Sequence, residues 1–490
     1  MIESVSEHIP CGLPILSNPA EESHATSIAD LYEATPLFKN GSHPFRCLAI
    51  AKFTINVYHR PALKPAFLYF GVMHDGWGIA ERGIDPFPAS AFGSGGTVFI
   101  PKGAVMKQID ECKEILADPY AYAVRFKAES RRKMVGTFCS YAPEEIIAAA
   151  GAHPFRLFGT GEKIRLAEAH LQSYCCSLVR GALEDALVGR LAFLDGVVFP
   201  HTCDSIQRLS DIWRLNVRHC FHIDLILPVK LDTPGARQYF VDVLNRFRGE
   251  LGEKLGAAIT DDDLRGAIVL YNRIRGALTR IYDLKSDRPE IMKGSDLYAL
   301  TRAAMIMDRT RVASLLEEVA SELERNGAAG AAAGPEKEER PVSGVPKKRV
   351  ILSGGVCNYP DITTIVEETG GAVVGDDLCT GARYFSGLID ENADPLTAIA
   401  GRYLERVVCP AKHRGLTDRA DHLIRLARDK KAQGVIFFLL KFCDPHAFDV
   451  PYLKEALDRA GILSMVIEVE DRLPAGGQLR TRFEAFLEMI

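Results

Sequence analysis

Short apolar runs alternate with helical patterns in the last third of the chain. The apolar runs are continuous rather than alternating, which is typical of strands that are buried on both faces of a sheet. They fall in residues 349–361, 372–379, 432–444 and 464–471. Helical patterns lie between them, at residues 361–371, 419–432 and 450–461. This alternation predicts a doubly wound parallel sheet.

An earlier part of the chain follows a similar scheme. An apolar strand, a loop with a cysteine and a helix occur in residues 133–159 and again in 194–214, and a third strand falls in 219–230. Residues 261–324 have a helical pattern with few strand signals. In the helices that follow these loops, Asp204 and Asp444 are interpreted as N-cap residues, and Glu144 and Glu145 as charges at a helix start.

The predicted fold class is therefore α/β, with two doubly wound parallel-sheet domains, a helical extension and a small N-terminal region. A segment rich in Ala, Gly, Pro and charge is interpreted as a flexible linker between the two domains. The expected limits are 1–105 for an N-terminal region of uncertain fold, 106–325 for the first α/β domain with its helical extension, 326–348 for the linker and 349–490 for the second α/β domain.

The composition and charge of the chain exclude several classes of protein. The 490 residues are 47% hydrophobic and 25% charged, and the net charge of −5 argues against a surface that binds nucleic acid. Residues 1–10 lack the pattern of a signal peptide, and no apolar run reaches the roughly 18–20 residues that a membrane span needs. We therefore expect a cytoplasmic protein whose thiols stay reduced.

The 12 cysteines then need an explanation other than disulfides. No two of them form a CxxC pair, which argues against a zinc ribbon, a thioredoxin motif or a ferredoxin-type run. A metal site would have to be assembled from residues that are distant in sequence.

Six cysteines share one kind of position on the predicted fold. Five follow apolar strands, where the ligand sites of open parallel sheets lie, and the sixth stands at a helix start. The six candidate ligands are Cys139, Cys176, Cys203, Cys357, Cys379 and Cys443. For a single cysteine, packing in the core is an equally good explanation, and Cys175 can replace Cys176. Cys11, Cys47, Cys112, Cys220 and Cys409 are interpreted as mostly structural. Many thiolates without a set of carboxylates and histidines favour an iron–sulfur cluster, and six exceed the four of one tetrahedral zinc.

Several segments resemble the 2-hydroxyacyl-CoA dehydratase / benzoyl-CoA reductase family, the 2-hydroxyglutaryl-CoA dehydratase D-component type. The resemblance covers about residues 106–490. It is carried by "FCSYAPEEIIAAAG" (138–151), "CCSLVRGAL" (175–183), "VVFPHTCDS" (197–205), "YNRIRGALTRIYDL" (271–284), "DDLCTGARY" (376–384), "KFCDPHAFDVPYLKEALDRAGI" (441–462) and "GQLRTRFEAFLEMI" (477–490).

The resemblance implies an oxygen-sensitive enzyme that binds its iron–sulfur cluster between two α/β domains. A separate ATP-hydrolysing iron–sulfur protein, the activator, would supply single low-potential electrons. In the dehydratases three cysteines hold one [4Fe–4S] cluster with an iron open to substrate. The corresponding positions here are Cys139, Cys176 and Cys443.

Three further cysteines in matching loops depart from that pattern. A branch of the family, the double-cubane cluster proteins, carries an [8Fe–9S] cluster on six cysteines of one chain and forms homodimers. The cysteine count favours this branch, a reductase that acts on a small substrate. The alternatives are a lyase or reductase subunit of a heterodimer with a [4Fe–4S] cluster, and a noncatalytic iron–sulfur assembly protein. His201 and His446 are candidate proton donors, although a polar loop residue is the simpler interpretation of each; no catalytic residue is assigned.

Overall fold

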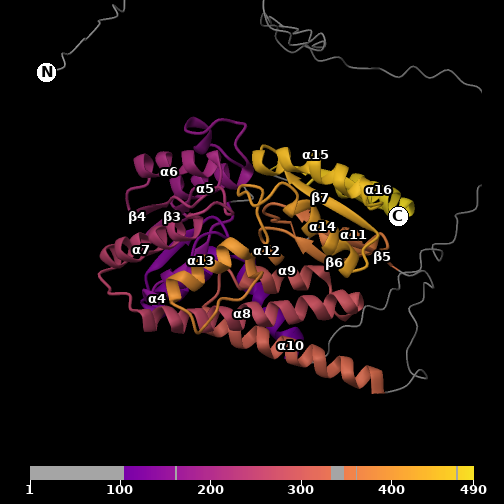
Figure 1. Ribbon diagram of the computed structural model, residues 1–490, viewed down its shortest axis with the longest axis horizontal. Coiled ribbons are helices and arrows are strands. Elements are labelled where there is room, and N and C mark those ends of the chain that lie inside the picture. The colour runs from indigo at the N-terminus through magenta and orange to yellow at the C-terminus, as the bar shows by residue number, and fades with distance from the viewer. Residues whose placement is uncertain (1–103, 160–162, 333–346, 360, 471–472) are drawn as a thin grey trace, which may run out of the picture. The chain divides into compact units, whose positions relative to one another are not determined.

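The computed structural model describes residues 104–159, 163–332, 347–359, 361–470 and 473–490 (Figure 1). The prediction for the N-terminal region falls almost entirely on residues 1–103, outside the described residues. None of the helices in the described ranges combines the length and the apolar character that a membrane span requires.

Two parallel sheets of four strands form the centre of the described part, so the predicted fold class is confirmed. The first sheet has the order β2-β1-β3-β4 and the second the order β6-β5-β7-β8. Their bounds are β1 (Met134–Thr137), β2 (His153–Arg156), β3 (Gly196–Pro200), β4 (Phe221–Leu225), β5 (Lys348–Gly354), β6 (Gly371–Asp377), β7 (Gly434–Leu440) and β8 (Leu463–Val469).

Helices connect the strands and cover the sheets. The bounds in the first half are α2 (Ala104–Ala117), α3 (Pro119–Ser130), α4 (Glu144–Ala149), α5 (Ser177–Leu187), α6 (Asp204–Asn216) and α7 (Ala236–Leu255). The helical extension consists of α8 (Asp261–Asp287), α9 (Gly294–Ala303) and α10 (Arg309–Ala332). The second half contains α11 (Asp361–Glu368), α12 (Ala382–Phe385), α13 (Pro395–Glu405), α14 (Asp418–Asp429), α15 (Asp444–Arg459) and α16 (Gly476–Met489).

Strand β2 is absent from the predicted elements. Its four residues, His153 to Arg156, include a proline and two polar side chains, so they lack the apolar signature of the other strands. Proline is tolerated there because β2 is an edge strand, where one side of the backbone needs no partner. Its burial comes from the elements that cover it rather than from its own hydrophobicity.

The start of the expected linker is helical. Helix α10 continues to Ala332, because the alanine-rich start of the expected linker has high helix propensity. Strand β5 begins at Lys348, and residues 333–346 between them lie outside the described residues.

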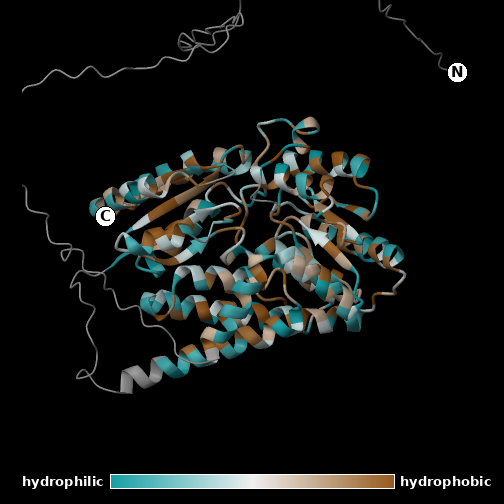
Figure 2. Ribbon diagram, turned by 180° about the vertical axis from the view of Figure 1, so that it is seen from behind, coloured by the Kyte–Doolittle hydropathy of each residue, from teal (hydrophilic) through white to brown (hydrophobic). Residues whose placement is uncertain are grey.

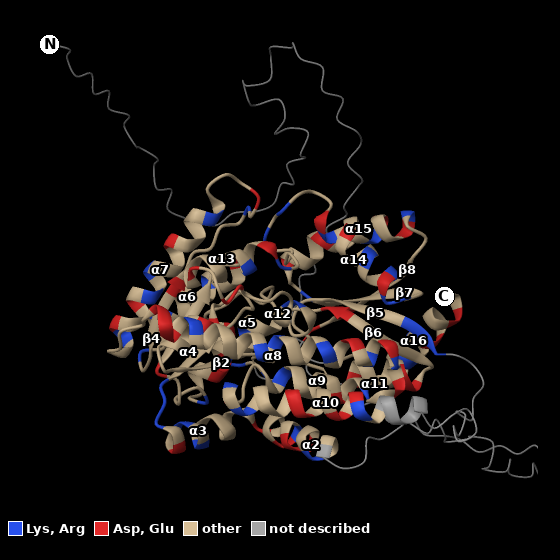
Figure 3. Ribbon diagram, turned by 60° about the horizontal axis from the view of Figure 1, so that its bottom comes forward, with Lys and Arg blue, Asp and Glu red and all other residues tan. Residues whose placement is uncertain are grey.

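The two halves are joined by helices that cross between them. Helix α13 of the second half packs on α7 and α8 of the first, and α8 packs against β6. Helices α8 and α10 lie side by side beneath the two sheets (Figure 1). Some strand stretches are brown in Figure 2, between helices with teal and brown stretches. The core contains buried apolar side chains from both sheets, including Phe199 and Phe438. Lys, Arg, Asp and Glu are interspersed along the outer helices (Figure 3).

The two glutamates at the start of α4 are buried, which the sequence interpretation did not foresee. Glu144 and Glu145 do occupy the first helical turn, as expected. Each is also paired with a buried arginine of the helical extension, Glu144 with Arg309 at 3.0 Å and Glu145 with Arg275. Glu144 also accepts a hydrogen bond of 3.1 Å from Tyr384 in α12, so its carboxylate links the two halves.

Candidate functional site

The strand order places cysteines at the positions where open parallel sheets bind ligands. In each sheet the order reverses between two neighbouring strands, β1 and β3 in the first and β5 and β7 in the second. Ligands bind outside the carboxyl ends of such a strand pair. Cys139 and Cys203 follow β1 and β3, and Cys357 and Cys443 follow β5 and β7. Both switch points therefore carry two thiols.

Three of the six predicted ligands line one cavity of about 410 Å³. These are Cys176, Cys203 and Cys443. Each is the N-cap residue of a helix, of α5, α6 and α15 respectively. Three helix N-termini thus converge on one space, and the positive ends of their dipoles favour negative charge there.

The N-cap interpretation of the aspartates is wrong by one residue. Asp204 and Asp444 are the first residues within α6 and α15, and the preceding cysteines are the caps. The backbone N–H groups of Ile206 and His446 consequently act on the thiols of Cys203 and Cys443. Phe442, just before Cys443, has φ of +65°, a strained value for a non-glycine residue that accompanies the turn into the cavity.

Burial keeps these cavity thiols protonated in the absence of a positive charge. It raises the pKa of Cys203 to about 12 and that of Cys443 well above its ordinary value. The neighbouring thiols, including Cys176, raise both pKa values further, whereas the helix N–H groups lower them. A bound cation such as iron would supply the charge that turns the three thiols into thiolates.

A second pair of predicted ligands, Cys139 and Cys379, lies in contact across the two halves. A hydrogen bond from Cys139 lowers the pKa of Cys379 well below its ordinary value. The charges of Arg156 and Arg383 also lower this pKa, whereas burial raises it. The guanidinium Nη2 of Arg156 donates to Cys379 Sγ at 3.5 Å. This pair is therefore suited to carry a thiolate.

Arg156 also supports an anionic occupant of the site. Its side chain is 1% exposed, and its Nε and Nη1 atoms have no hydrogen-bond partner among the described residues. Buried donors without acceptors are costly, so an additional negative group would stabilise them. A thiolate-bound iron–sulfur cluster is such a group, and the donor set fits it.

The sixth predicted ligand, Cys357, does not line the cavity, but its loop is joined to that of Cys379 by a hydrogen bond of 3.0 Å from Cys357 N to Thr380 Oγ1. It is 3% exposed, and its surroundings are Arg302, Asp376 and Tyr359 rather than another thiol. Burial raises its pKa to about 11. Cys175 does not line the cavity, and its thiol donates to Gln172 Oε1 at 3.8 Å, so the geometry favours Cys176 of that pair.

The structure brings forward Cys409, which the sequence interpretation placed among the packing cysteines. It contributes to the raised pKa values of Cys139, Cys203 and Cys443, and the next residue, Pro410, lines the thiol cavity. The signal that could have found it is the Cys-Pro dipeptide at 409–410, a pairing that also ends some iron–sulfur runs.

The predicted ligands do not meet at one point. Among the residues that the structure describes, no three His, Cys, Asp or Glu side chains meet closely enough to hold one metal ion. In a cluster each thiolate binds a different iron, so its ligands surround a space instead of meeting at a point.

The two candidate histidines have different surroundings. His201 pairs with Asp224 at 2.8 Å. His446 is buried against Arg383, and burial together with the charges of Arg383 and Arg419 lowers its pKa well below the ordinary value. His446 is therefore neutral, which argues against a role as a cationic proton donor.

Comparison with known proteins identifies the family of the chain. A family model described as "2-hydroxyglutaryl-CoA dehydratase, D-component" matches residues 139–490, a span that contains all six predicted ligands. The chain belongs to this family. The chain is similar to the (R)-phenyllactyl-CoA dehydratase beta subunit of Clostridium sporogenes, with 27% identity over 384 residues, 78% of this chain and 99% of that protein.

Two further relatives extend the comparison. The (R)-2-hydroxyglutaryl-CoA dehydratase beta subunit of Acidaminococcus fermentans is 28% identical over 393 residues, 79% of this chain and 100% of that protein. A benzoyl-CoA reductase subunit of Thauera aromatica is 30% identical over 357 residues, 71% of this chain and 88% of that protein. These relatives are enzyme subunits, so the predicted family and the expectation of an enzyme are confirmed. They argue against the alternative of a noncatalytic assembly protein.

Proposed function

We propose that this member of the dehydratase family is an oxygen-sensitive iron–sulfur reductase of the double-cubane type, located in the cytoplasm. The observations that carry the proposal are the convergence of Cys176, Cys203 and Cys443 on one cavity and the contact between Cys139 and Cys379. An [8Fe–9S] cluster joins two four-iron units, and two neighbouring groups of thiols match that division.

The protein's own residues have three tasks in this account. The thiols hold the cluster, the N-termini of α5, α6 and α15 and the guanidinium of Arg156 offset its negative charge, and the surrounding core excludes water. The bound cluster would supply single electrons of low potential to a small substrate.

Two versions of this proposal differ in the third cysteine that binds the second four-iron unit. Cys139 and Cys379 would be joined either by Cys357, as the sequence interpretation holds, or by Cys409, which contributes to the raised pKa of Cys139. We expect Cys409→Ser to lower the iron content by up to about half, one of two four-iron units, and Cys357→Ser to leave it unchanged.

The measurement is the ratio of iron to protein after anaerobic purification of the wild type and both variants. Loss of iron in Cys357→Ser with none in Cys409→Ser would restore the sequence-based set. Full iron in both variants would contradict a second unit with three thiolates from this chain.

The electron donor in this proposal is an ATP-hydrolysing activator that docks where the cavity approaches the surface. Phe448, which lines the cavity, is 84% exposed. The chain itself would pair with a second copy, whereas the matched relatives are named as subunits, which keeps a heterodimer as the alternative. ATP-dependent reduction of the purified chain by a matching activator tests this step.

A second candidate is a 2-hydroxyacyl-CoA dehydratase or benzoyl-CoA reductase subunit with one [4Fe–4S] cluster. The names of the relatives favour it. It would use Cys139, Cys176 and Cys443, but the cavity that Cys176 and Cys443 share is not lined by Cys139. Dehydration or reduction of an acyl-CoA thioester, with about four irons per chain, would support this candidate.

A further inference from the structure

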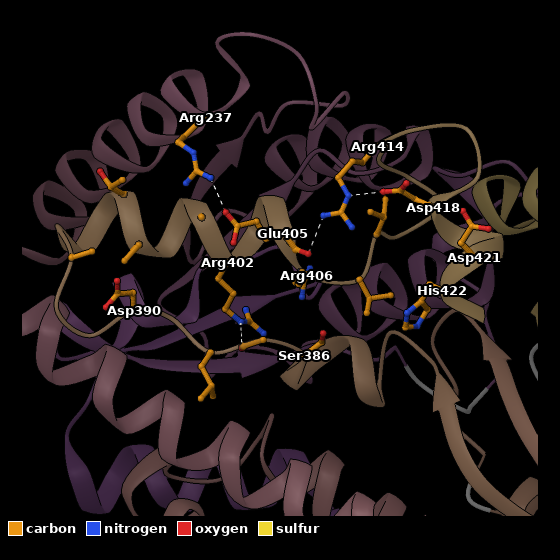
Figure 4. Close-up of a pocket in the computed structure, with 18 of the residues that line it drawn as sticks. Arg237, Ser386, Asp390, Arg402, Glu405, Arg406, Arg414, Asp418, Asp421 and His422 are labelled. Carbon is orange, nitrogen blue, oxygen red and sulfur yellow. Dashed lines mark hydrogen bonds and ion pairs between the residues drawn. The ribbon is translucent and has the colours of Figure 1, made fainter. Parts of the chain in front are cut away.

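A second cavity, of about 660 Å³, lies between α13 and α14 (Figure 4). It contains no cysteine among its lining residues and is therefore separate from the thiol cavity. Five arginines line it. They belong to α7, to the end of α13 and the loop that follows it, and to α14: Arg237, Arg402, Arg406, Arg414 and Arg425. Its volume is within the range of about 300–1,000 Å³ that is usual for small-molecule sites.

The charges at the rim of this cavity largely neutralise one another. Arg237 pairs with Glu405 and Arg414 pairs with Asp418, each at 2.7 Å (Figure 4). Two other carboxylates line the cavity, those of Asp390 and Asp421, and both residues are exposed to solvent. The rim as a whole therefore has no strong preference for an anion.

The inner wall is different. Arg402 and Arg406 are each 5% exposed, and neither forms an ion pair with a described residue. Arg402 donates to the carbonyl oxygens of Gly387 and Tyr384, both at 2.8 Å. The carboxylate that acts on Arg402 most directly, that of Glu145, is already paired with Arg275.

Arg406 likewise meets only neutral partners. It donates to the carbonyl oxygen of Arg383 at 2.8 Å and to Ser140 Oγ at 3.3 Å, and its Nε has no partner among the described residues. Its guanidinium lies 4.1 Å from the centre of the Tyr141 ring. The C-terminal end of the α13 dipole offsets part of the two charges, but no counter-ion does.

The electrostatics agree with this geometry. Burial, together with the charges of Arg275 and Arg406, lowers the pKa of Arg402 to about 9. His422 lines the same cavity, and burial lowers its pKa. The charge of Asp377 raises this pKa, whereas the charges of three arginines lower it further: Arg419, Arg383 and Arg425. Buried cations without a counter-ion are costly, and a bound anion would remove that cost.

We propose that this cavity binds the phosphate group of a small phosphorylated molecule. A phosphate presents several oxygens to guanidinium groups at once, and arginine is suited to such planar, two-point recognition. Arg402 and Arg406 supply the inner contacts, and Arg425, for which no ion pair is found among the described residues, supplies a contact from α14. No thiol lines the cavity, so binding of a phosphate there can be measured separately from the iron content.

The test uses the full-length chain and pyrophosphate as the probe, titrated calorimetrically at constant ionic strength because salt screens exposed charges. We expect saturable binding with a Kd of about 1 mM or tighter. Arg402→Gln and Arg425→Gln should each weaken it roughly tenfold, the effect of one charge-assisted hydrogen bond. Arg428→Gln is the matched control, since Arg428 is exposed on the same helix α14 and does not line the cavity.

Three results would overturn the proposal: no saturable heat, an equal loss of affinity in Arg428→Gln, or binding of succinate as tight as that of pyrophosphate. The absence of saturable heat would show that the cavity does not bind pyrophosphate. Equal loss in Arg428→Gln would show diffuse electrostatic attraction instead of a site. Equally tight binding of succinate would show that the site does not select phosphate over carboxylate. Should Arg402→Gln fail to fold, the exposed position of Arg425 makes its variant decisive.

Discussion

The Cys176→Ser variant is expected to lose about half or more of its iron while the chain stays folded. Cys176 lines the thiol cavity at the N-cap of α5, and serine is itself a favoured N-cap residue, so the helix start should survive the change. The hydroxyl of serine has too high a pKa to replace a thiolate as an iron ligand.

Cys175→Ser is the matched control for this experiment. Cys175 is adjacent in sequence and 5% exposed, but it does not line the cavity. It should keep the full iron content and the visible absorption of the cluster. Iron and acid-labile sulfide per chain are measured after anaerobic purification. Equal loss in both variants, or loss in Cys175→Ser alone, would contradict the assignment of Cys176.

The second large effect is expected at the buried ion pair between Glu144 and Arg309, whose carboxylate also accepts from Tyr384 of the second half. Arg309 is 3% exposed and donates to Glu144 Oε2 at 3.0 Å, to the Tyr271 hydroxyl at 3.0 Å and to the carbonyl oxygen of Pro154 at 2.8 Å. Arg309→Met leaves the Glu144 carboxylate buried without a cation. We expect a loss of about 3–5 kcal/mol in the free energy of unfolding, measured by urea denaturation.

Arg311→Met provides the comparison on the same helix. Arg311 pairs with Glu111 at 2.5 Å, but both side chains are partly exposed, so its loss should cost only about 0–1 kcal/mol. The double variant Glu144→Gln/Arg309→Met removes the orphaned charge and should recover part of the stability of Arg309→Met. Similar losses of stability in Arg309→Met and Arg311→Met would show that the Glu144–Arg309 pair contributes less to the free energy of unfolding than expected.

This pair also bears on the candidate cluster site. Glu144 is five residues after Cys139, and Tyr384, which donates to its carboxylate, is five residues after Cys379. The ion pair therefore fixes both loops that bring these two thiols into contact. Loss of iron in Arg309→Met, with all cysteines intact, is the expected secondary effect.

Some of these features could be predicted from local sequence patterns. The strands β1, β3, β4, β5, β6, β7 and β8 are mostly short apolar runs, and the cysteines that follow them could be placed at strand ends because parallel strands share one direction. The fold class and the positions of Cys203 and Cys443 on the cavity depend on this local regularity, whereas Cys176 is placed by its helix start.

Features that depend on distant contacts could not be predicted in this way. Strand β2 has a polar sequence and is recognised only by its partner β1, and α13 packs on α7 although about 140 residues separate them. The role of Glu144 depends on two residues that are distant in sequence, Arg309 of the helical extension and Tyr384 of the second half. Cys409 follows a helix instead of a strand, so its approach to the other thiols has no signature in strand pattern.

The iron content of the full-length chain, purified and kept without oxygen, tests the central claim most directly. The proposed double-cubane site predicts about eight irons per chain with a comparable amount of acid-labile sulfide. About four irons would favour the single-cluster alternative. A folded chain with no iron after anaerobic reconstitution with iron and sulfide would contradict the claim that these thiols hold a cluster.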